Sequence, residues 1–165
     1  MTEPRWLTPE EKQAWTGLAS LLLLMPGRLE APLQKAHGLS LFEYLALSHV
    51  SEADGRRLAM SELAFLANGS LSRLSNVVKR FEQRGWVWRY PDPEDGRRTL
   101  VELTDKGLAV VRAAAPTHVH AVRRAVLEPL SAADQRALTR IAAALRTTEN
   151  AGRDVEGSRS PRVEE

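Results

Sequence analysis

The sequence predicts a mainly α-helical fold with one small β-hairpin. A long stretch near each end of the chain carries apolar residues at every third or fourth position, which is typical of amphipathic helices. Between them, two shorter helical stretches are separated only by Asn68-Gly69, a pair that favours a sharp turn. Two runs of alternating apolar residues follow, joined by a charged turn that contains a glycine, and this pattern predicts a hairpin.

The composition fits one ordinary domain. The chain has 165 residues, of which 43% are hydrophobic. Its longest apolar run, Leu18 to Met25, is far shorter than the roughly 20 residues that cross a bilayer, so we expect no membrane partner. The polar N-terminus shows no signal peptide, and we expect a cytoplasmic protein. Because the chain has no cysteine, thiolate metal sites and thiol-based sensing are excluded, and we expect no metal or other cofactor.

The N-terminal part is expected to form two helices. After seven flexible residues, Thr8 and Glu11 have the spacing of a capping box at a helix start. Pro26 and Pro32 should bend or interrupt this helix before it ends near residue 38. A second helix begins at Ser40 and ends in the polar turn "ADGRR".

The next two helices are "MSELAFLA" and "SLSRLSNVVKRFEQR". Ser70 can cap the second of them, and Gly85 stands where a glycine commonly ends a helix. One side of the second helix is apolar: Leu74, Val77, Val78 and Phe81. Its remaining positions are mostly polar, so we expect it to pack by one side and to present the other.

The hairpin strands are "WVWRY" and "TLVELT", and two more helices follow. Thr104 should cap a long helix that runs to about residue 128 with a bend at Pro116, and "SAAD" should begin a last helix lined by Leu138 to Leu145. The expected regions are a flexible N-terminus (1–7), an N-terminal dimerisation region (8–38), a DNA-binding domain (39–104), C-terminal dimerisation helices (105–147) and a disordered tail (148–165).

Two helices joined by a short turn and followed at once by a hairpin have the order of a winged helix-turn-helix. The second helix of that motif can enter the major groove of DNA, which is about 12 Å wide, with its N-terminal side chains at base edges. The candidates for base contact are Ser72, Arg73, Ser75 and Asn76, and the small Ser70 lets the helix backbone approach the DNA. The candidates for phosphate contact are Lys79 and Arg80. At the hairpin tip, Arg97 and Arg98 would contact the minor groove or the adjacent backbone, and Asp95 would hold the Arg97 guanidinium in a bidentate pair.

Each of these features also has a plain structural interpretation. A turn of mixed charge is most often only solvated, and polar residues on a helix most often form its wet side. However, residues 68–101 contain seven basic and four acidic side chains, a local excess of +3. The order of the elements and their short connections therefore favour nucleic acid as the partner.

The stretch 61–107 resembles the MarR family of bacterial transcriptional regulators. The resemblance lies in Ser-x-Leu-Ala from Ser61, a serine-led recognition helix, Arg-Gly, and a hairpin pattern Asp-x-Arg-x-x-x-Val-x-Leu-Thr-x-x-Gly. That last pattern is filled by Asp95, Arg97, Val101, Leu103, Thr104 and Gly107. The resemblance covers about residues 8–146. It departs at Leu71, where the family often has proline, and at Asn76, where it often has arginine, so no operator sequence can be inferred.

The resemblance implies a homodimer built from the first, fifth and sixth helices, a palindromic DNA site, and often a small ligand or oxidant that releases DNA. The absent cysteines exclude the thiol-sensing branch. The apolar stripes at both ends also favour a dimer, because one small winged core could not cover them. The alternative is that they pack within one chain as a helical bundle.

The leading hypothesis is a dimeric, sequence-specific DNA-binding regulator, with repression as the expected outcome. One rival is a winged-helix module that binds protein and not DNA. A second rival is an enzyme that uses a cavity between helices, but the sequence shows no catalytic motif. His118 and His120, two residues apart on a helix, cannot chelate one ion together, and we expect both at the surface.

Overall fold

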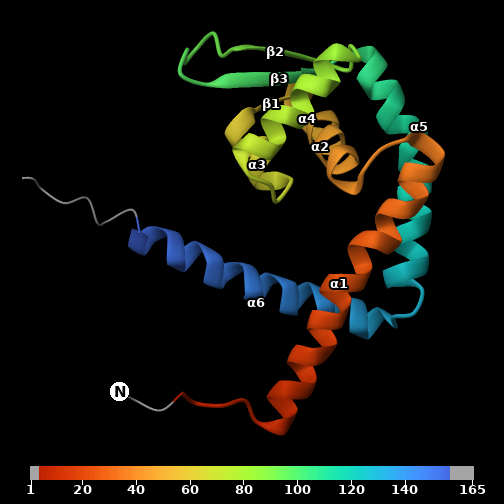
Figure 1. Cartoon of the computed structure of the whole chain (residues 1–165), viewed down its shortest axis with the longest axis vertical. Helices are drawn as coiled ribbons and strands as arrows, with labels where there is room; N and C mark the ends of the chain where they lie inside the picture. Colours follow the sequence, from red (N-terminus) through yellow and green to blue (C-terminus); the bar gives the residue numbers. More distant parts are fainter. Residues whose placement is uncertain (1–3, 157–165) are drawn as a thin grey trace, which may run out of the picture. The chain divides into compact units, whose positions relative to one another are not determined.

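The computed structural model describes residues 4–156, with side chains placed for residues 4–146. It confirms a mainly helical fold with a small antiparallel sheet (Figure 1). The elements are α1 (Pro9–His37), α2 (Leu41–Glu52), the 3₁₀ turn η1 (Asp54–Arg56), β1 (Arg57–Ala59), α3 (Met60–Leu66), α4 (Leu71–Gln83), β2 (Val87–Pro91), β3 (Thr99–Leu103), α5 (Asp105–Val122), the π-helical turn η2 (Arg123–Leu127) and α6 (Ala132–Glu156). The chain divides into two compact units, the first ending at Ala125 and the second beginning at Val126.

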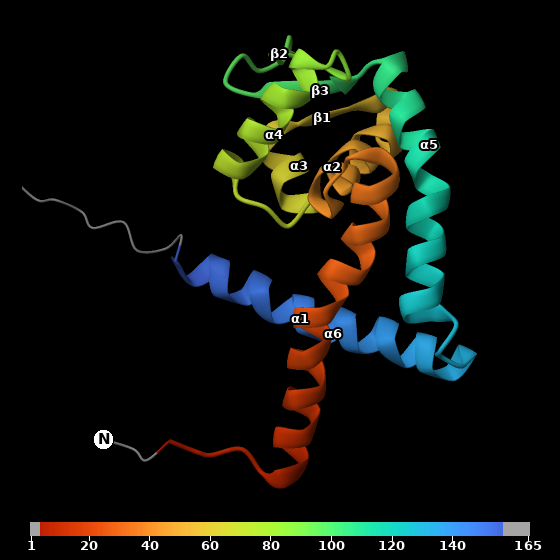
Figure 2. The ribbon, with the colours of Figure 1, turned by 45° about the vertical axis from the view of Figure 1, so that its right-hand side comes forward.

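Helix α1 begins as predicted but is not interrupted. The Thr8 backbone N–H donates to Glu11 at 2.8 Å, and the Glu11 N–H donates to the Thr8 hydroxyl at 3.2 Å. We expected a bend or an interruption at Pro26 and Pro32, and an interruption is excluded because the helix continues through both residues. Packing compensates for the missing hydrogen bonds: Leu33 is fully buried, and α5 lies along this part of α1 (Figures 1 and 2).

Helix α2 is followed by a strand that the sequence did not reveal. Arg56 has a φ of 55° in the turn after α2, and β1 then pairs antiparallel with β3. The sheet order is therefore β1-β3-β2, with β3 in the centre. Three residues are too few to show an alternating pattern, so the sequence alone does not reveal this strand. It is ordered by its pairing with β3, far along the chain.

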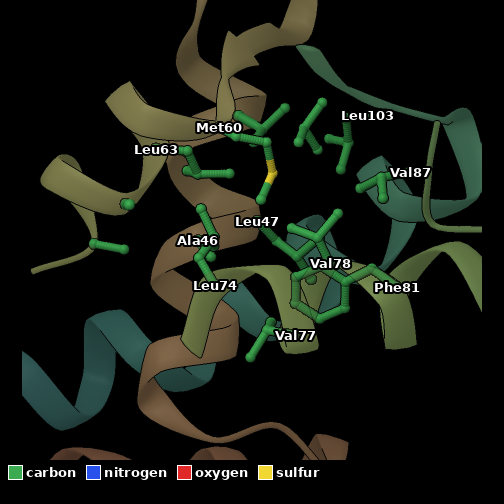
Figure 3. Packing of buried hydrophobic residues seen from close by; sticks show 14 of the residues in the cluster. Ala46, Leu47, Met60, Leu63, Leu74, Val77, Val78, Phe81, Val87 and Leu103 are labelled. Atoms are coloured by element: carbon green, nitrogen blue, oxygen red, sulfur yellow. The ribbon is translucent and has the colours of Figure 1, made fainter. Parts of the chain in front are cut away.

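The turn between α3 and α4 forms at Asn68 and Gly69, as predicted. Asn68 has a φ of 50°, and the Gly69 N–H donates to the Ala64 carbonyl at 2.9 Å. The Ser70 hydroxyl accepts the Arg73 N–H at 3.2 Å, so the predicted cap is present. The predicted apolar side of α4 is buried, and Figure 3 shows Leu74, Val77, Val78 and Phe81 gathered with Ala46, Leu47, Val87 and Leu103.

The hairpin leads directly into α5. Strands β2 and β3 pair in register from Val87 opposite Leu103 to Pro91 opposite Thr99. The Thr104 hydroxyl accepts the Gly107 N–H at 3.0 Å, which confirms the predicted cap. The α-helix ends at Val122, earlier than predicted, and continues only as the π-helical turn η2.

In the second unit, the last helix begins with a reciprocal cap between Ser131 and Asp134, as the "SAAD" stretch predicts. Helix α6 runs to Glu156, beyond residue 147, where we expected the helical region to end. The rest of the expected tail, 157–165, lies outside the described residues. In the described part of the chain, none of the helices combines the length and the apolar character that a bilayer span requires.

A smaller buried cluster joins α1, α2 and α5 around Leu33 and Tyr44. The expectation that His118 lies at the surface was wrong: its ring is half-buried, with its centroid 4.6 Å from that of Tyr44. Its Nδ1 atom is buried and has no hydrogen-bond partner among the described residues. The preceding residue, Thr117, has its hydroxyl 2.9 Å from His37 Nε2, which links α5 to the end of α1.

Burial lowers the pKa of the His118 imidazole below its ordinary value of 6.5. A depressed histidine pKa means that the unfolded chain binds the proton first, so stability falls as the pH drops below about 6.5. We expect His118→Phe to flatten this part of the stability curve, whereas His120→Phe, at an exposed position, should not. Urea unfolding at a series of pH values would measure this, and parallel curves for wild type and His118→Phe would contradict it.

Candidate nucleic-acid interface

The side of α4 opposite its buried residues carries three of the predicted contact residues. Ser72, Asn76 and Lys79 are four and three residues apart, so they lie along one side of the helix, and all three are exposed. Lys79 has no ion-pair partner among residues 4–146. Ser75 is half-buried at the margin of this side. A polar surface whose one charge is an ammonium group without an ion-pair partner can approach a DNA groove without first giving up internal contacts.

The two arginines of α4 lie on a different side, against the start of α2. The guanidinium carbon of Arg73 is 4.1 Å from the centre of the Phe42 ring. Arg80 Nη2 is 2.9 Å from Glu43 Oε1. The structure thus separates the predicted residues of α4 into an outward group and a pair of arginines that also contact α2.

Glu43 contacts one of the predicted site residues, Arg80, and the sequence reasoning missed this contact. Its Oε2 accepts the Ser40 backbone N–H at 2.9 Å, while its other oxygen binds Arg80. Burial by itself would raise the pKa of this carboxyl, but the hydrogen bonds from Ser40 and Arg80 outweigh it and lower the pKa below 4.5. The spacing of Ser40 and Glu43 suggests only a helix cap, so nothing in the sequence indicates the second contact.

We expect Glu43→Gln to lower the free energy of unfolding at pH 7 by about 1–2 kcal/mol, because Arg80 is half-exposed and solvent screens part of the pair. The depressed pKa places this stabilisation above pH 4.5, and it should disappear as the pH falls through the folded-state pKa. Chemical unfolding at pH 7 and pH 3 checks this, with Glu94→Gln at the exposed hairpin as control. An equal destabilisation at both pH values would contradict the assignment.

The hairpin tip is organised by Asp92. The Asp92 N–H donates to the Arg98 carbonyl at 2.9 Å, and its Oδ1 accepts the Glu94 N–H at 3.0 Å. Arg98 Nη1 is 3.7 Å from Asp92 Oδ2. Asp95 Oδ1 accepts the backbone N–H of Arg97 at 3.1 Å, so its contact with Arg97 is to the main chain. Among the described residues no ion pair joins Asp95 to the Arg97 guanidinium, so the predicted bidentate pair is absent from this structure.

The cations of residues 68–101 differ in how far they are already engaged. Arg80, Arg89 and Arg98 pair with Glu43, Glu82 and Asp92. The guanidinium carbons of Arg73 and Arg84 lie over the rings of Phe42 and Trp86. Within the described part of the chain, Lys79 and Arg97 have neither kind of partner, so these two charges are the most available to a polyanion.

Comparisons with known proteins show which family this chain belongs to. The MarR family model matches residues 37–98, from the end of α1 to the hairpin tip. Sco3205 of Streptomyces coelicolor, a MarR family transcriptional regulator whose crystal structure is in complex with DNA, is 40% identical. The likeness covers 88% of this chain and 91% of that one, with a TM-score of 0.82. This chain belongs to the MarR family.

A second MarR family regulator, AbsC of the same organism, is 37% identical over 87% of this chain and 99% of its own, with a TM-score of 0.78. Among curated proteins, the transcriptional repressor MprA of Escherichia coli (strain K12) is 27% identical over 82 residues, which are 50% of this chain and 47% of that protein. The match thus spans less than half of the length of this curated relative. MarR membership agrees with the winged helix-turn-helix that α3, α4 and the hairpin form.

Proposed function

We propose that this MarR-family chain is a homodimeric, cytoplasmic transcriptional regulator that binds double-stranded DNA at a palindromic site and represses transcription. The observation that carries the proposal is the pair of uncompensated cations, Lys79 on the outward side of α4 and Arg97 at the hairpin tip. The similarity to Sco3205, which was crystallised in complex with DNA, and to the transcriptional repressor MprA supports it. Release by a small-molecule effector stays a prediction of the family resemblance.

In this proposal, α4 is the recognition helix: its first turns face base edges and its later residues face phosphates. Base contacts are assigned to Ser72, Arg73, Ser75 and Asn76, and close approach of the helix N-terminus to the DNA is assigned to Ser70. Contacts to the DNA backbone and minor groove are assigned first to Lys79 and Arg97. Arg80 and Arg98 come second, because each would have to bind DNA while it also pairs with a carboxylate of its own chain. The Arg97 N–H donates to Asp95 Oδ1, and this hydrogen bond fixes the backbone position from which the Arg97 side chain extends.

The dimer is supported by the apolar surface of α1. Its N-terminal half exposes several large side chains, with Leu23 84% exposed: Trp15, Leu18, Leu21, Leu22, Leu23 and Leu24. Helix α6 also exposes Leu138 and Ile141. Water-exposed apolar surface of this extent favours burial against a second copy, and two-fold symmetry would place two α4 helices about one DNA turn apart.

The deciding experiment is selection of bound duplexes from a random pool, with sedimentation of the protein alone and with the selected duplex. We expect a two-fold symmetric consensus bound by two copies of the chain. A winged module that binds protein and not DNA would select no consensus. A consensus without internal symmetry, or binding by a single copy, would contradict the dimer.

A further inference from the structure

The first turn of α2 packs against the start of α4 through Phe42. Phe42 is 7% exposed, and a Cβ atom on Gly69 would come within 2.5 Å of its ring. The face of the same ring carries the Arg73 guanidinium at 4.1 Å. One edge of the Phe42 ring therefore fills the space beside the interhelical turn, while its face supports a side chain of α4.

This contact restricts Arg73 without consuming its hydrogen-bond donors. The Arg73 guanidinium carbon lies over the face of the ring. A guanidinium that lies flat on an aromatic face keeps its N–H groups in its own plane, so they remain free to donate hydrogen bonds. The Arg73 backbone is fixed as well, because its N–H donates to Ser70. Arg80 illustrates the difference: its partner Glu43 accepts one of its N–H groups, whereas a phenyl ring has no oxygen or nitrogen atom to accept one.

We propose that Phe42 is a positioning residue for DNA recognition, which holds the Arg73 guanidinium in the orientation that reads a guanine. Two parallel N–H donors at the edge of the guanidinium match the O6 and N7 acceptors of guanine in the major groove. Removing the ring would free the side chain, so the choice of base would relax while contacts to phosphates remain. The inference rests on the proposed function and assigns a role within it to a residue outside the helix-turn-helix.

The chain offers a matched control. Arg84 stacks on Trp86 at 4.8 Å, but at the opposite end of α4 from the residues expected to face bases. Trp86→Leu therefore removes an arginine–aromatic contact of the same kind without disturbing Arg73. Should Phe42→Leu fail to fold, Phe42→Met, which retains an apolar side chain of similar length, takes its place.

The test compares the consensus duplex with one altered at the base pair whose preference Arg73→Ala abolishes. We expect Phe42→Leu to reduce the ratio of the two Kd values about fivefold, and Trp86→Leu to leave it unchanged. In the Arg73→Ala background, adding Phe42→Leu should change the ratio no further. A ratio unchanged in Phe42→Leu, an equal reduction in Trp86→Leu, or an additive reduction in the double variant would each overturn the assignment.

A second measurement needs no DNA. In the free protein, the ring current of Phe42 should shift the side-chain protons of Arg73 upfield in NMR spectra, and Phe42→Leu should remove the shift. An unshifted Arg73 in the wild type would overturn the inference. If the wild type selects no duplex, the proposed function falls together with this inference. If it selects a consensus and only Phe42→Leu is silent, the positioning role alone falls.

Discussion

Replacing Lys79 and Arg97 together by glutamine is expected to weaken DNA binding about 100-fold at low salt. These are the two cations of the interface that have no carboxylate or ring partner within the described residues, so their full charge is available to phosphates. Removing one protein–phosphate ion pair should reduce the slope of log K against log salt by about 0.9, so the double variant should reduce it by about 1.8 for each bound protomer. Titration of the selected duplex at several salt concentrations measures both the affinity and the slope.

The control is a double variant with the same change in net charge, Arg56→Gln with Arg89→Gln. Both of these arginines already pair with carboxylates, Arg56 with Asp105 at 3.1 Å and Arg89 with Glu82 at 3.0 Å. Their replacement should leave the salt slope close to that of the wild type. If the two double variants weakened binding equally, net charge alone would govern affinity. If neither had an effect, the DNA surface would lie elsewhere.

The elements that sequence reasoning predicted well depend on short-range interactions. Thr8, Ser70 and Thr104 each cap a helix through an atom three residues away, so the pattern is complete within a few letters. Strand β1 was not predictable in this way, because its three residues are ordered by pairing with β3 more than forty positions later. The continuity of α1 through Pro26 depends likewise on packing that no local pattern shows.

The same distinction applies to the candidate site. The helical pattern of α4 predicted which side is buried, and Leu74 and Val78 are fully buried. It did not predict that Phe42 and Glu43 would hold the two arginines, because these residues come from α2 and their own spacing suggests only a core residue and a cap. Contacts with residues from a distant segment of the chain therefore decide which polar side chains of α4 are available to bind DNA.

Gly107→Ala is expected to lower the free energy of unfolding by about 3 kcal/mol, which is a large part of the stability of an ordinary domain. A Cβ atom here would be 2.1 Å from the Trp86 carbonyl oxygen and 2.7 Å from a methyl carbon of Leu103. The carbonyl cannot move aside easily, since it accepts hydrogen bonds from the Thr104 N–H and the Thr104 hydroxyl, both at 3.0 Å. Relief of the clash therefore requires α5 to move away from the hairpin.

The control for this substitution is Gly17→Ala in α1, where a Cβ atom would meet nothing within 4 Å. Alanine is intrinsically better than glycine inside a helix by up to about 1 kcal/mol, so this variant should be as stable as the wild type or more stable. Urea unfolding followed by circular dichroism, at one fixed protein concentration, compares the three proteins, because dimer formation would make stability concentration-dependent. Since helix propensity favours both alanines equally, a Gly107→Ala protein as stable as Gly17→Ala would show that α5 is not held against the hairpin by this contact.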